Sequence, residues 1–284
     1  MYKYWLLLFL MSMVPQAYSQ NKPAYQIFNA KGKRISYGKM KKKLASKDIV
    51  LFGEIHNNPI DHWLQLELLQ DLFQVRKTIL GFEMFEADNQ EPLDRYLKGE
   101  LEQIDADSTM RLWGNYHTDY APLVEFAKMH HIPVIATNVP AQYAKNVYRY
   151  GFKALEGLDE KALSYIAPQP MPFDPDLKTY QDILEMMAHH GTPELVMAQA
   201  LRDATMAHFI LKYYQPGTLF LHMNGTYHSE YYEGILWYLR QSQPTLQYGT
   251  IATTDQPSLK KLLEENKGKA DFIICVDENM AKTH

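Results

Sequence analysis

The strongest pattern in the chain is an apolar run that ends abruptly in polar residues. Residues 49–52 read Ile-Val-Leu-Phe, which is typical of a short buried strand, and Glu54 and His56 follow almost at once. Pro59 then opens residues 59–76, in which leucines recur at helical spacing. The pattern predicts a strand, a loop and a helix, with polar side chains at the carboxyl end of the strand. In open α/β sheets, ligands bind at that end of the strands.

Further apolar runs predict more strands, and amphipathic stretches between them predict helices. Residues 78–84 form the next strand pattern, so we expect residues 49–52 and 78–84 to be parallel neighbours joined by a right-handed crossover. Residues 25–28 and 34–37 fit a small hairpin. The other predicted strands are residues 134–138, 218–223, 246–252 and 271–276, and the other predicted helices are residues 85–98, 229–241 and 258–266 and a helix that starts near residue 118.

Residues 140–214 differ from the rest of the chain because they carry helical patterns and no strand pattern. The expected fold class is therefore α/β, with a mainly parallel sheet flanked by helices and a helical insertion subdomain. We assign residues 20–139 and 215–284 to the α/β core domain, and residues 140–214 to the insertion.

The first 19 residues have the features of a cleaved signal peptide. Lys3 precedes a short apolar stretch, and Ala17-Tyr18-Ser19 is a variant of the small-residue cleavage site, so Gln20 is the expected mature start. The alternative is an N-terminal membrane anchor. The single cysteine, Cys275, lies in an apolar run far from the cleavage site, which leaves no cysteine there for lipid attachment. We expect an exported protein, either periplasmic or secreted.

The composition of the 284 residues narrows the choice of partners. Hydrophobic residues make up 46% and charged residues 22%, which fits a globular protein. The formal net charge of −4 argues against nucleic acid as a partner. A basic helical stretch at residues 38–46 is interpreted as a solvated helix face.

Acidic and histidine side chains gather at the predicted strand ends, although no Walker loop, G-x-G-x-x-G, H-E-x-x-H or C-x-x-C motif is present. Glu54 and His56 are two positions apart and share a face in an extended strand. Glu83 ends the second strand, and His228 closes a second strand–Gly-x-x-His–helix unit that also contains His222.

Two kinds of chemistry fit this group. His56, Glu83, His222 and His228 are the predicted ligands of a divalent metal with a position left open. Without a metal, the same groups can serve as general base and acid. The alternative for each histidine alone is a hydrogen-bonded residue with a structural role.

Arg202 lies in a helix that is apolar almost all round, so its charge needs an anionic partner. Glu54, Glu83 or a ligand carboxylate can supply one, and the alternative is a local ion pair between packed helices. Asp203 faces elsewhere and is a candidate to orient a histidine.

Met and Tyr residues are frequent in the insertion, which suits a floor for a flat aromatic ligand, although core packing of the methionines is the alternative. Tyr116, Tyr143 and Tyr227 are the aromatic residues nearest to the polar motifs, and a phenolate can bind ferric haem. Asn138, which ends the strand at residues 134–138, is a further candidate cofactor contact.

Six segments of the chain, most of them at or near the predicted strand ends, form a recognisable set: Leu51-Phe-Gly-Glu-Ile-His56, Gly81-Phe-Glu-Met-Phe85, Pro133-Val-Ile-Ala-Thr-Asn-Val-Pro140, Arg149-Tyr-Gly151, Gln199-Ala-Leu-Arg-Asp203 and Asn224-Gly-Thr-Tyr-His228. These segments resemble the ChaN-like haem-binding uptake family, which shares a superfamily with Tiki metalloproteases, TraB-like proteins and erythromycin esterases. The resemblance implies an α/β domain with a smaller helical part, haem binding linked to iron acquisition, and an acid–histidine cleft formed by Glu54, His56, Glu83, Arg202 and His228.

Two functional hypotheses follow. The first is an exported haem-binding protein that holds or delivers haem for iron uptake, as a homodimer around the ligand and with haem transport components of the outer or inner membrane as partners. The alternative is a metal-dependent hydrolase that uses Glu54, His56, Glu83 and His228. A third reading is an exported α/β domain whose polar cleft has lost its function.

Overall fold

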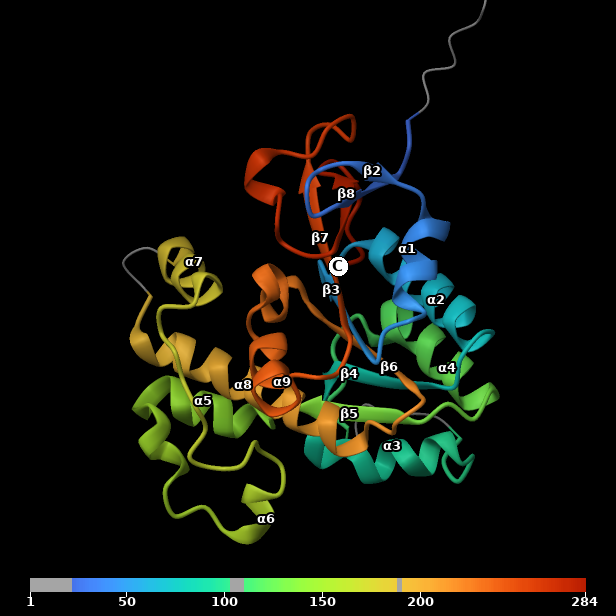
Figure 1. Cartoon of the computed structure of the whole chain (residues 1–284). Helices are drawn as coiled ribbons and strands as arrows, with labels where there is room; N and C mark the ends of the chain where they lie inside the picture. The colour runs from blue at the N-terminus through green and yellow to red at the C-terminus, as the bar shows by residue number, and fades with distance from the viewer. Residues whose placement is uncertain (1–21, 103–109, 188–190) are drawn as a thin grey trace, which may run out of the picture.

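The computed structural model describes residues 22–102, 110–187 and 191–284, so the predicted signal peptide lies outside the described residues. The described chain forms one eight-stranded sheet in the order β2-β1-β8-β7-β3-β6-β4-β5 (Figure 1). The six strands β8, β7, β3, β6, β4 and β5 are parallel to one another, and β1 runs antiparallel to both of its neighbours, β2 and β8. The strands are β1 (Tyr25–Asn29), β2 (Arg34–Ile35), β3 (Ile49–Glu54), β4 (Thr78–Glu86), β5 (Val134–Asn138), β6 (Leu219–Gly225), β7 (Tyr248–Gln256) and β8 (Phe272–Asp277).

Helices cover both faces of this sheet, which confirms the predicted α/β class. One apolar core joins the sheet to α1, α2 and α4, and a second joins the other face to α8 and α9. No helix among the described residues is both long enough and apolar enough to cross a membrane. The helices are α1 (Tyr37–Leu44), α2 (Pro59–Phe73), α3 (Gln90–Leu97), α4 (Ala121–Met129), α5 (Ala141–Tyr150), α6 (Glu160–Leu163), α7 (Lys178–Met186), α8 (Pro193–Tyr213) and α9 (Ile235–Ser242).

Strand β3 shows why an unbroken apolar run was needed at the centre of the sheet. Val50 and Phe52 pack into the core on the α2 side, whereas Ile49 and Leu51 pack into the core on the α8 side. Successive side chains of a strand point to opposite faces, so a strand covered on both faces must be apolar at every position. Polar residues can begin only where the strand reaches the edge of the sheet, at Glu54.

The predicted pairing of β3 with β4 is wrong in one respect. The two strands are parallel, as expected, but β6 lies between them and pairs with both. Strand β6 is buried along its whole length, from Leu219 to Gly225, and so takes a central place in the sheet. As a result, the carboxyl ends of β3, β6 and β4 meet side by side.

The helix predicted at residues 258–266 is also wrong. The described structure has only a short turn of 3₁₀ helix there, at Glu264–Asn266. The buried side chain of Gln256 binds the loop instead: its amide donates to the carbonyl of Lys261 (2.7 Å) and accepts from the amide of Leu263 (3.2 Å). Such side-chain bonds to the backbone compete with the helical ladder.

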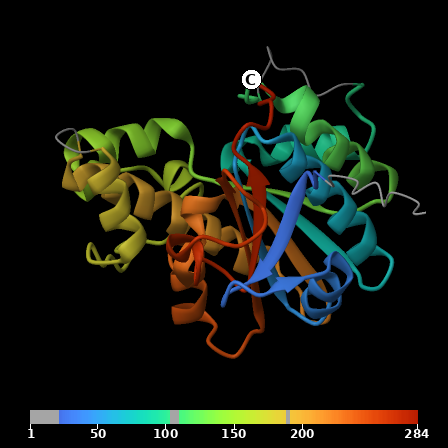
Figure 2. The same ribbon diagram turned by 90° about the horizontal axis from the view of Figure 1, so that it is seen from above.

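The chain between β5 and β6 is helical where it is described. Helices α5, α6 and α7 lie to one side of the sheet, at the left of Figure 1 and again at the left of Figure 2. Helix α8 packs against β5, α5 and α9, and so connects this group to the sheet. Its buried face brings Asp203 toward the carboxyl ends of the strands.

Candidate functional site

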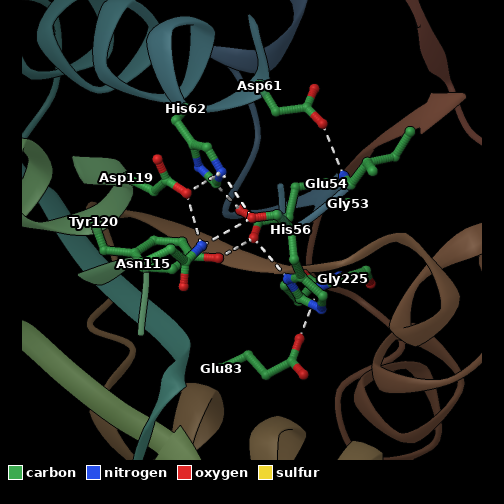
Figure 3. A network of polar contacts seen from close by, with 12 residues as sticks. Gly53, Glu54, His56, Asp61, His62, Glu83, Asn115, Asp119, Tyr120 and Gly225 are labelled. Atoms are coloured by element: carbon green, nitrogen blue, oxygen red, sulfur yellow. Dashed lines mark hydrogen bonds and ion pairs between the residues drawn. The ribbon is translucent and has the colours of Figure 1, made fainter. Parts of the chain in front are cut away.

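Glu54 is the centre of the first half of the site. It is the last residue of β3 and is almost fully buried. Its Oε1 accepts hydrogen bonds from His56 Nδ1 (2.8 Å) and from the Tyr120 hydroxyl (2.6 Å), and its Oε2 accepts one from the Gln65 amide. Glu54, His56 and Tyr120 lie close together in Figure 3. A buried carboxyl group with this many donors is held in one orientation, and its oxygens are not left unpaired.

Glu83 forms the second half of the site and lies on β4, which is separated from β3 by β6. Its Oε2 accepts the backbone amide of Gly225 at 2.7 Å, and its Oε1 lies 3.1 Å from His228 Nε2. Burial by itself raises the pKa of a carboxyl, but the positive charge of His228, with help from His56, holds the pKa of Glu83 far below its ordinary value. Glu83 is therefore a buried carboxylate.

His228 connects this carboxylate to the helical side of the molecule. Its Nδ1 lies 2.5 Å from Oδ1 of Asp203 in α8, and Asp203 also accepts the Tyr180 hydroxyl at 2.9 Å. Burial lowers the pKa of an imidazole, but the two carboxylates outweigh it and raise the pKa of His228 to about 10. Asp203 was predicted to orient a histidine, and its contact with Nδ1 of His228 fits that prediction.

His56 is the solvent-accessible member of the site, with 37% of its side chain exposed. The ring packs edge-on against Trp113 at 4.8 Å between centroids. Burial lowers its pKa, but the hydrogen bond to Glu54 and the charge of Glu83 raise it by more. His56 is thus an imidazole that carries a proton more readily than usual, at the mouth of a buried acidic pair.

Gly225 sets the distance between the two halves. A Cβ atom at this position would lie 2.7 Å from His56 Nε2 and 3.6 Å from Glu83 Oε2. Real Cβ atoms do not approach a ring so closely, so His56 approaches the end of β6 only because this residue has no side chain.

We expect Gly225→Ala to move His56 away from Glu83 and to lower the pKa of His56. The measurement is a titration of the histidine ring signals by NMR, with Gly38→Ala as the control because no atom lies within 4 Å of its added Cβ. An unchanged His56 titration in Gly225→Ala would show that the two halves are not in contact through this point.

A second polar layer supports the site from the α2 side, and the sequence analysis missed it. The His62 ring lies 3.3 Å from Asp119, and Asn115 donates to Asp119 (2.7 Å) and to the backbone carbonyl of His56 (3.0 Å). Near the C-terminus, the hydroxyl of Thr283 also donates to Asp119 at 2.7 Å. The available signal was the pair His62 and Gln65, which lie three positions apart in α2 next to the leucines of its apolar face.

Asp61 is a buried carboxyl of a different kind. It accepts the backbone amide of Ile55 (2.8 Å) and contacts the Thr253 hydroxyl (2.7 Å), which also lies 3.0 Å from the carbonyl of Gly53. Burial outweighs these bonds and raises the pKa of Asp61 to about 8. The folded protein therefore keeps a proton on Asp61 at neutral pH, and this proton can bond to Thr253 while Thr253 donates to Gly53.

Asp61→Asn is expected to flatten the pH dependence of stability between about pH 4 and pH 8. An acid whose pKa is raised in the folded state keeps its proton there while the unfolded chain loses it, so the free energy of unfolding falls as the pH rises through this range. Asn can replace the protonated acid because it offers one acceptor to Ile55 and one donor to Thr253. Urea unfolding at several pH values measures the effect, and a wild-type slope that persists in Asp61→Asn would contradict it.

The four predicted metal ligands do not come together as a set. His222 is fully buried in β6, where its ring nitrogens contact the Thr137 hydroxyl (2.7 Å) and Asn224 Oδ1 (3.1 Å). Burial lowers the pKa of His222 to about 4, so it is a neutral histidine inside the sheet. Across residues 22–102, 110–187 and 191–284, no group of three or more His, Cys, Asp or Glu side chains is arranged to hold a metal ion.

Arg202 lies beside Asn138 and not beside a carboxylate. Its Nη1 donates to Asn138 Oδ1 at 3.4 Å, which joins α8 to the end of β5. In the described part of the chain, Arg202 forms no ion pair with Glu54 or Glu83, whose oxygens are taken by the histidines and the other donors above. Arg202 and Asn138 thus lie where α8 meets the end of β5.

Comparison with known proteins identifies the family. The model of the family described as "Haem-binding uptake, Tiki superfamily, ChaN" matches residues 40–239, which include Glu54, Glu83, Asp203 and His228. The chain belongs to the ChaN family. No match was found among curated proteins.

Solved structures share the ChaN fold at low sequence identity. A structure described as "Cofacial heme binding to ChaN of Campylobacter jejuni" has a TM-score of 0.66 at 16% identity and covers 89% of this chain and 97% of its own. A Bacillus cereus protein has a TM-score of 0.52 at 12% identity, covering 89% and 95%. A succinoglycan biosynthesis protein has a TM-score of 0.51 at 11% identity, covering 83% and 89%. These similarities establish the fold and assign no role to individual residues.

The three tyrosines considered as haem ligands in this ChaN-family chain have different surroundings. Tyr116 is 4% exposed and packs edge-on against Phe85, whereas Tyr143 is half-buried in α5. Tyr227 is 42% exposed and directly precedes His228 at the end of β6. Its hydroxyl lies 3.8 Å from the sulfur of Met186 in α7. Of the three, Tyr227 is the most exposed residue and is adjacent in sequence to His228 of the acid–histidine site.

Proposed function

We propose that this ChaN-family protein is exported, binds haem and takes part in haem uptake for iron acquisition. The observation that carries the proposal is the match to the haem-binding uptake family, because it extends over both halves of the acid–histidine site and the segment that holds Tyr227. The signal-peptide pattern of residues 1–19 supports export to the periplasm or the exterior.

The haem face that we propose is formed by Tyr227, by Met186 at the end of α7, and by Met187, which follows it. Met186 is 58% exposed and Met187 is 43% exposed, so two adjacent apolar side chains, one of them beside the Tyr227 hydroxyl, are accessible to a ligand. Methionine adapts to flat apolar surfaces, and a tyrosine oxygen can bind ferric haem iron. In this arrangement Tyr227 would provide the axial oxygen and the methionines would contact the porphyrin plane.

An open face of this kind leaves the other side of a bound haem in water, which favours a homodimer that encloses the ligand. The C. jejuni ChaN structure is described as binding haem cofacially, and we propose that two copies of this chain pair over their haem faces in the same way. Sedimentation with and without haemin tests this: a dimer that forms only with haemin supports it, and a monomer at saturating haemin contradicts it. Haem transport components of the outer or inner membrane are the proposed recipients.

A spectrophotometric titration with haemin distinguishes the haem face from the acid–histidine site. Wild type and His56→Ala should bind haemin with equal affinity, because His56 points at Glu54 and Gly225 and not at Tyr227. If His56→Ala abolishes binding, the cleft itself is the haem site and Tyr227 is not the anchor.

A second candidate function is acid–base chemistry at Glu54, His56, Glu83 and His228. The observation that favours it is the half-exposed, readily protonated His56 beside the buried Glu83 carboxylate, which is an arrangement for proton transfer. The metal-dependent form of this hypothesis gains no support from the described side chains. Hydrolysis of ester or amide substrates that His56→Ala abolishes, with haemin binding intact, would support this second function.

A further inference from the structure

The opposite edge of the sheet carries a second site, which we call the basal pocket. It lies at the amino ends of β3, β7 and β8 and has a volume of about 640 Å³. Four cationic side chains line it: Lys31, Lys43, Lys47 and Arg240. Lys31 lies in the turn between β1 and β2, and Lys43 lies near the end of α1. Lys47 lies two residues before β3, and Arg240 lies near the end of α9.

These cations have no negative partner within the described structure. None of the four forms an ion pair there, although neighbouring cations do: Lys41 pairs with Asp71 at 2.9 Å and Arg76 pairs with Asp48 at 3.3 Å. Four like charges around one hollow repel each other, and a cleft lined by one sign of charge concentrates counter-ions.

The basal pocket has one acidic residue, Asp271, in its lining, so its cations are in excess by four to one. Asp271 uses one oxygen to accept the backbone amide of Thr250 (3.1 Å) and the other to accept the Tyr232 hydroxyl (3.4 Å). Its carboxylate is thereby tied to the sheet edge. The chain that builds this side of the pocket is also basic throughout, with nine Lys and Arg residues and no Asp or Glu from residue 22 to residue 47.

We propose that the basal pocket binds an anion that carries phosphate groups. Arg offers paired donors that fit phosphate oxygens, and Lys offers compact charges, so three lysines and an arginine suit a group with more than one negative charge. The pocket volume is in the range of sites for small organic ligands. Two sources share this chemistry: a soluble organic phosphate and the headgroup of an anionic phospholipid. The site is independent of the proposed haem function, because it lies at the other end of the strands.

The test compares two pairs of substitutions that remove the same charge. Lys43→Gln with Arg240→Gln removes two pocket cations, whereas Lys39→Gln with Lys42→Gln removes two exposed cations of α1 that do not line the pocket. The probes are inorganic pyrophosphate, followed by calorimetry, and vesicles of phosphatidylcholine with and without phosphatidylglycerol, followed by sedimentation. Urea unfolding serves as the folding control for every variant.

We expect binding that weakens with salt and falls roughly a hundredfold in the pocket pair, at about tenfold for each charged contact removed. The α1 pair should bind nearly as wild type does. Pyrophosphate binding with this pattern identifies a soluble phosphate as the source, and vesicle binding alone with this pattern identifies a lipid headgroup. Equal losses in the two pairs, or no binding of either probe by wild type, would overturn the proposal.

Discussion

His228→Ala is expected to destabilise the protein by about 3–5 kcal/mol at neutral pH, because it leaves two buried carboxylates without their cation. Glu83 and Asp203 lie on opposite sides of this ring, at 3.1 Å and 2.5 Å, and both are almost fully buried. Urea unfolding measures the loss. His208→Ala is the matched control, since His208 lies in the same helix as Asp203 but is half-buried and its pKa is lowered by burial and Lys212.

Because of His228, we also expect the free energy of unfolding to fall at alkaline pH. The pKa of His228 is about 10 in the folded protein against an ordinary value of 6.5, so its contribution is complete below pH 6.5 and disappears as the pH rises through 10. On the acid side, Glu83 contributes above its ordinary pKa of 4.5 and stops doing so as the pH falls toward its depressed value. A His228→Ala variant that kept the full alkaline decline would show that His228 is not the group that titrates.

Tyr227→Phe is expected to weaken haemin binding about a hundredfold or more and to change the spin state of the bound iron. Loss of one charge-assisted bond costs roughly 1.5–3 kcal/mol, and loss of a direct ligand to iron costs more. Phe keeps the ring beside Met186 but lacks the oxygen. Electron paramagnetic resonance of the ferric complex reports the ligand directly.

The controls for this substitution are Tyr143→Phe and Tyr148→Phe. Tyr148 is 47% exposed on α5, which makes it comparable to Tyr227 in exposure but part of a different element. Both controls should bind haemin as wild type does. If Tyr227→Phe binds equally well and gives the same resonance signal, another residue provides the ligand.

The sequence was most informative about features that depend on a single strand or helix. The apolar run before Glu54 could be assigned to a strand covered on both faces, and the polar residues after it had to lie at the sheet edge. The role of Asp203 also followed from local geometry, because a residue adjacent to Arg202 on a helix must point in another direction.

What could not be predicted depended on contacts between distant segments. The insertion of β6 between β3 and β4 places His228 next to Glu83, and no local pattern encodes this strand order. Tyr116 was proposed from its place near a motif, whereas Tyr120, one turn later, donates to Glu54. Both rings are buried, but the π-helical turn at Tyr116–Tyr120 directs the Tyr120 hydroxyl to Glu54, and its spacing is not visible in the hydrophobic pattern.

The two ends of the sheet have opposite electrostatic character in this protein. Carboxylates and histidines pair with one another at the carboxyl ends of β3, β4 and β6. Cations that form no ion pair within the described part of the chain line the basal pocket at the amino ends of β3, β7 and β8. The haem proposal and the phosphate proposal therefore concern separate surfaces. Variants of one surface can serve as folding controls for the other.

The most direct test of haem binding is a haemin titration of the chain from Gln20 onward, followed in the Soret region. The account predicts saturable binding with a shifted band specific to the protein, at one haem for each chain. A spectrum that stays that of free haemin, or one that rises without saturation, would contradict the assignment of this ChaN-family chain to haem uptake.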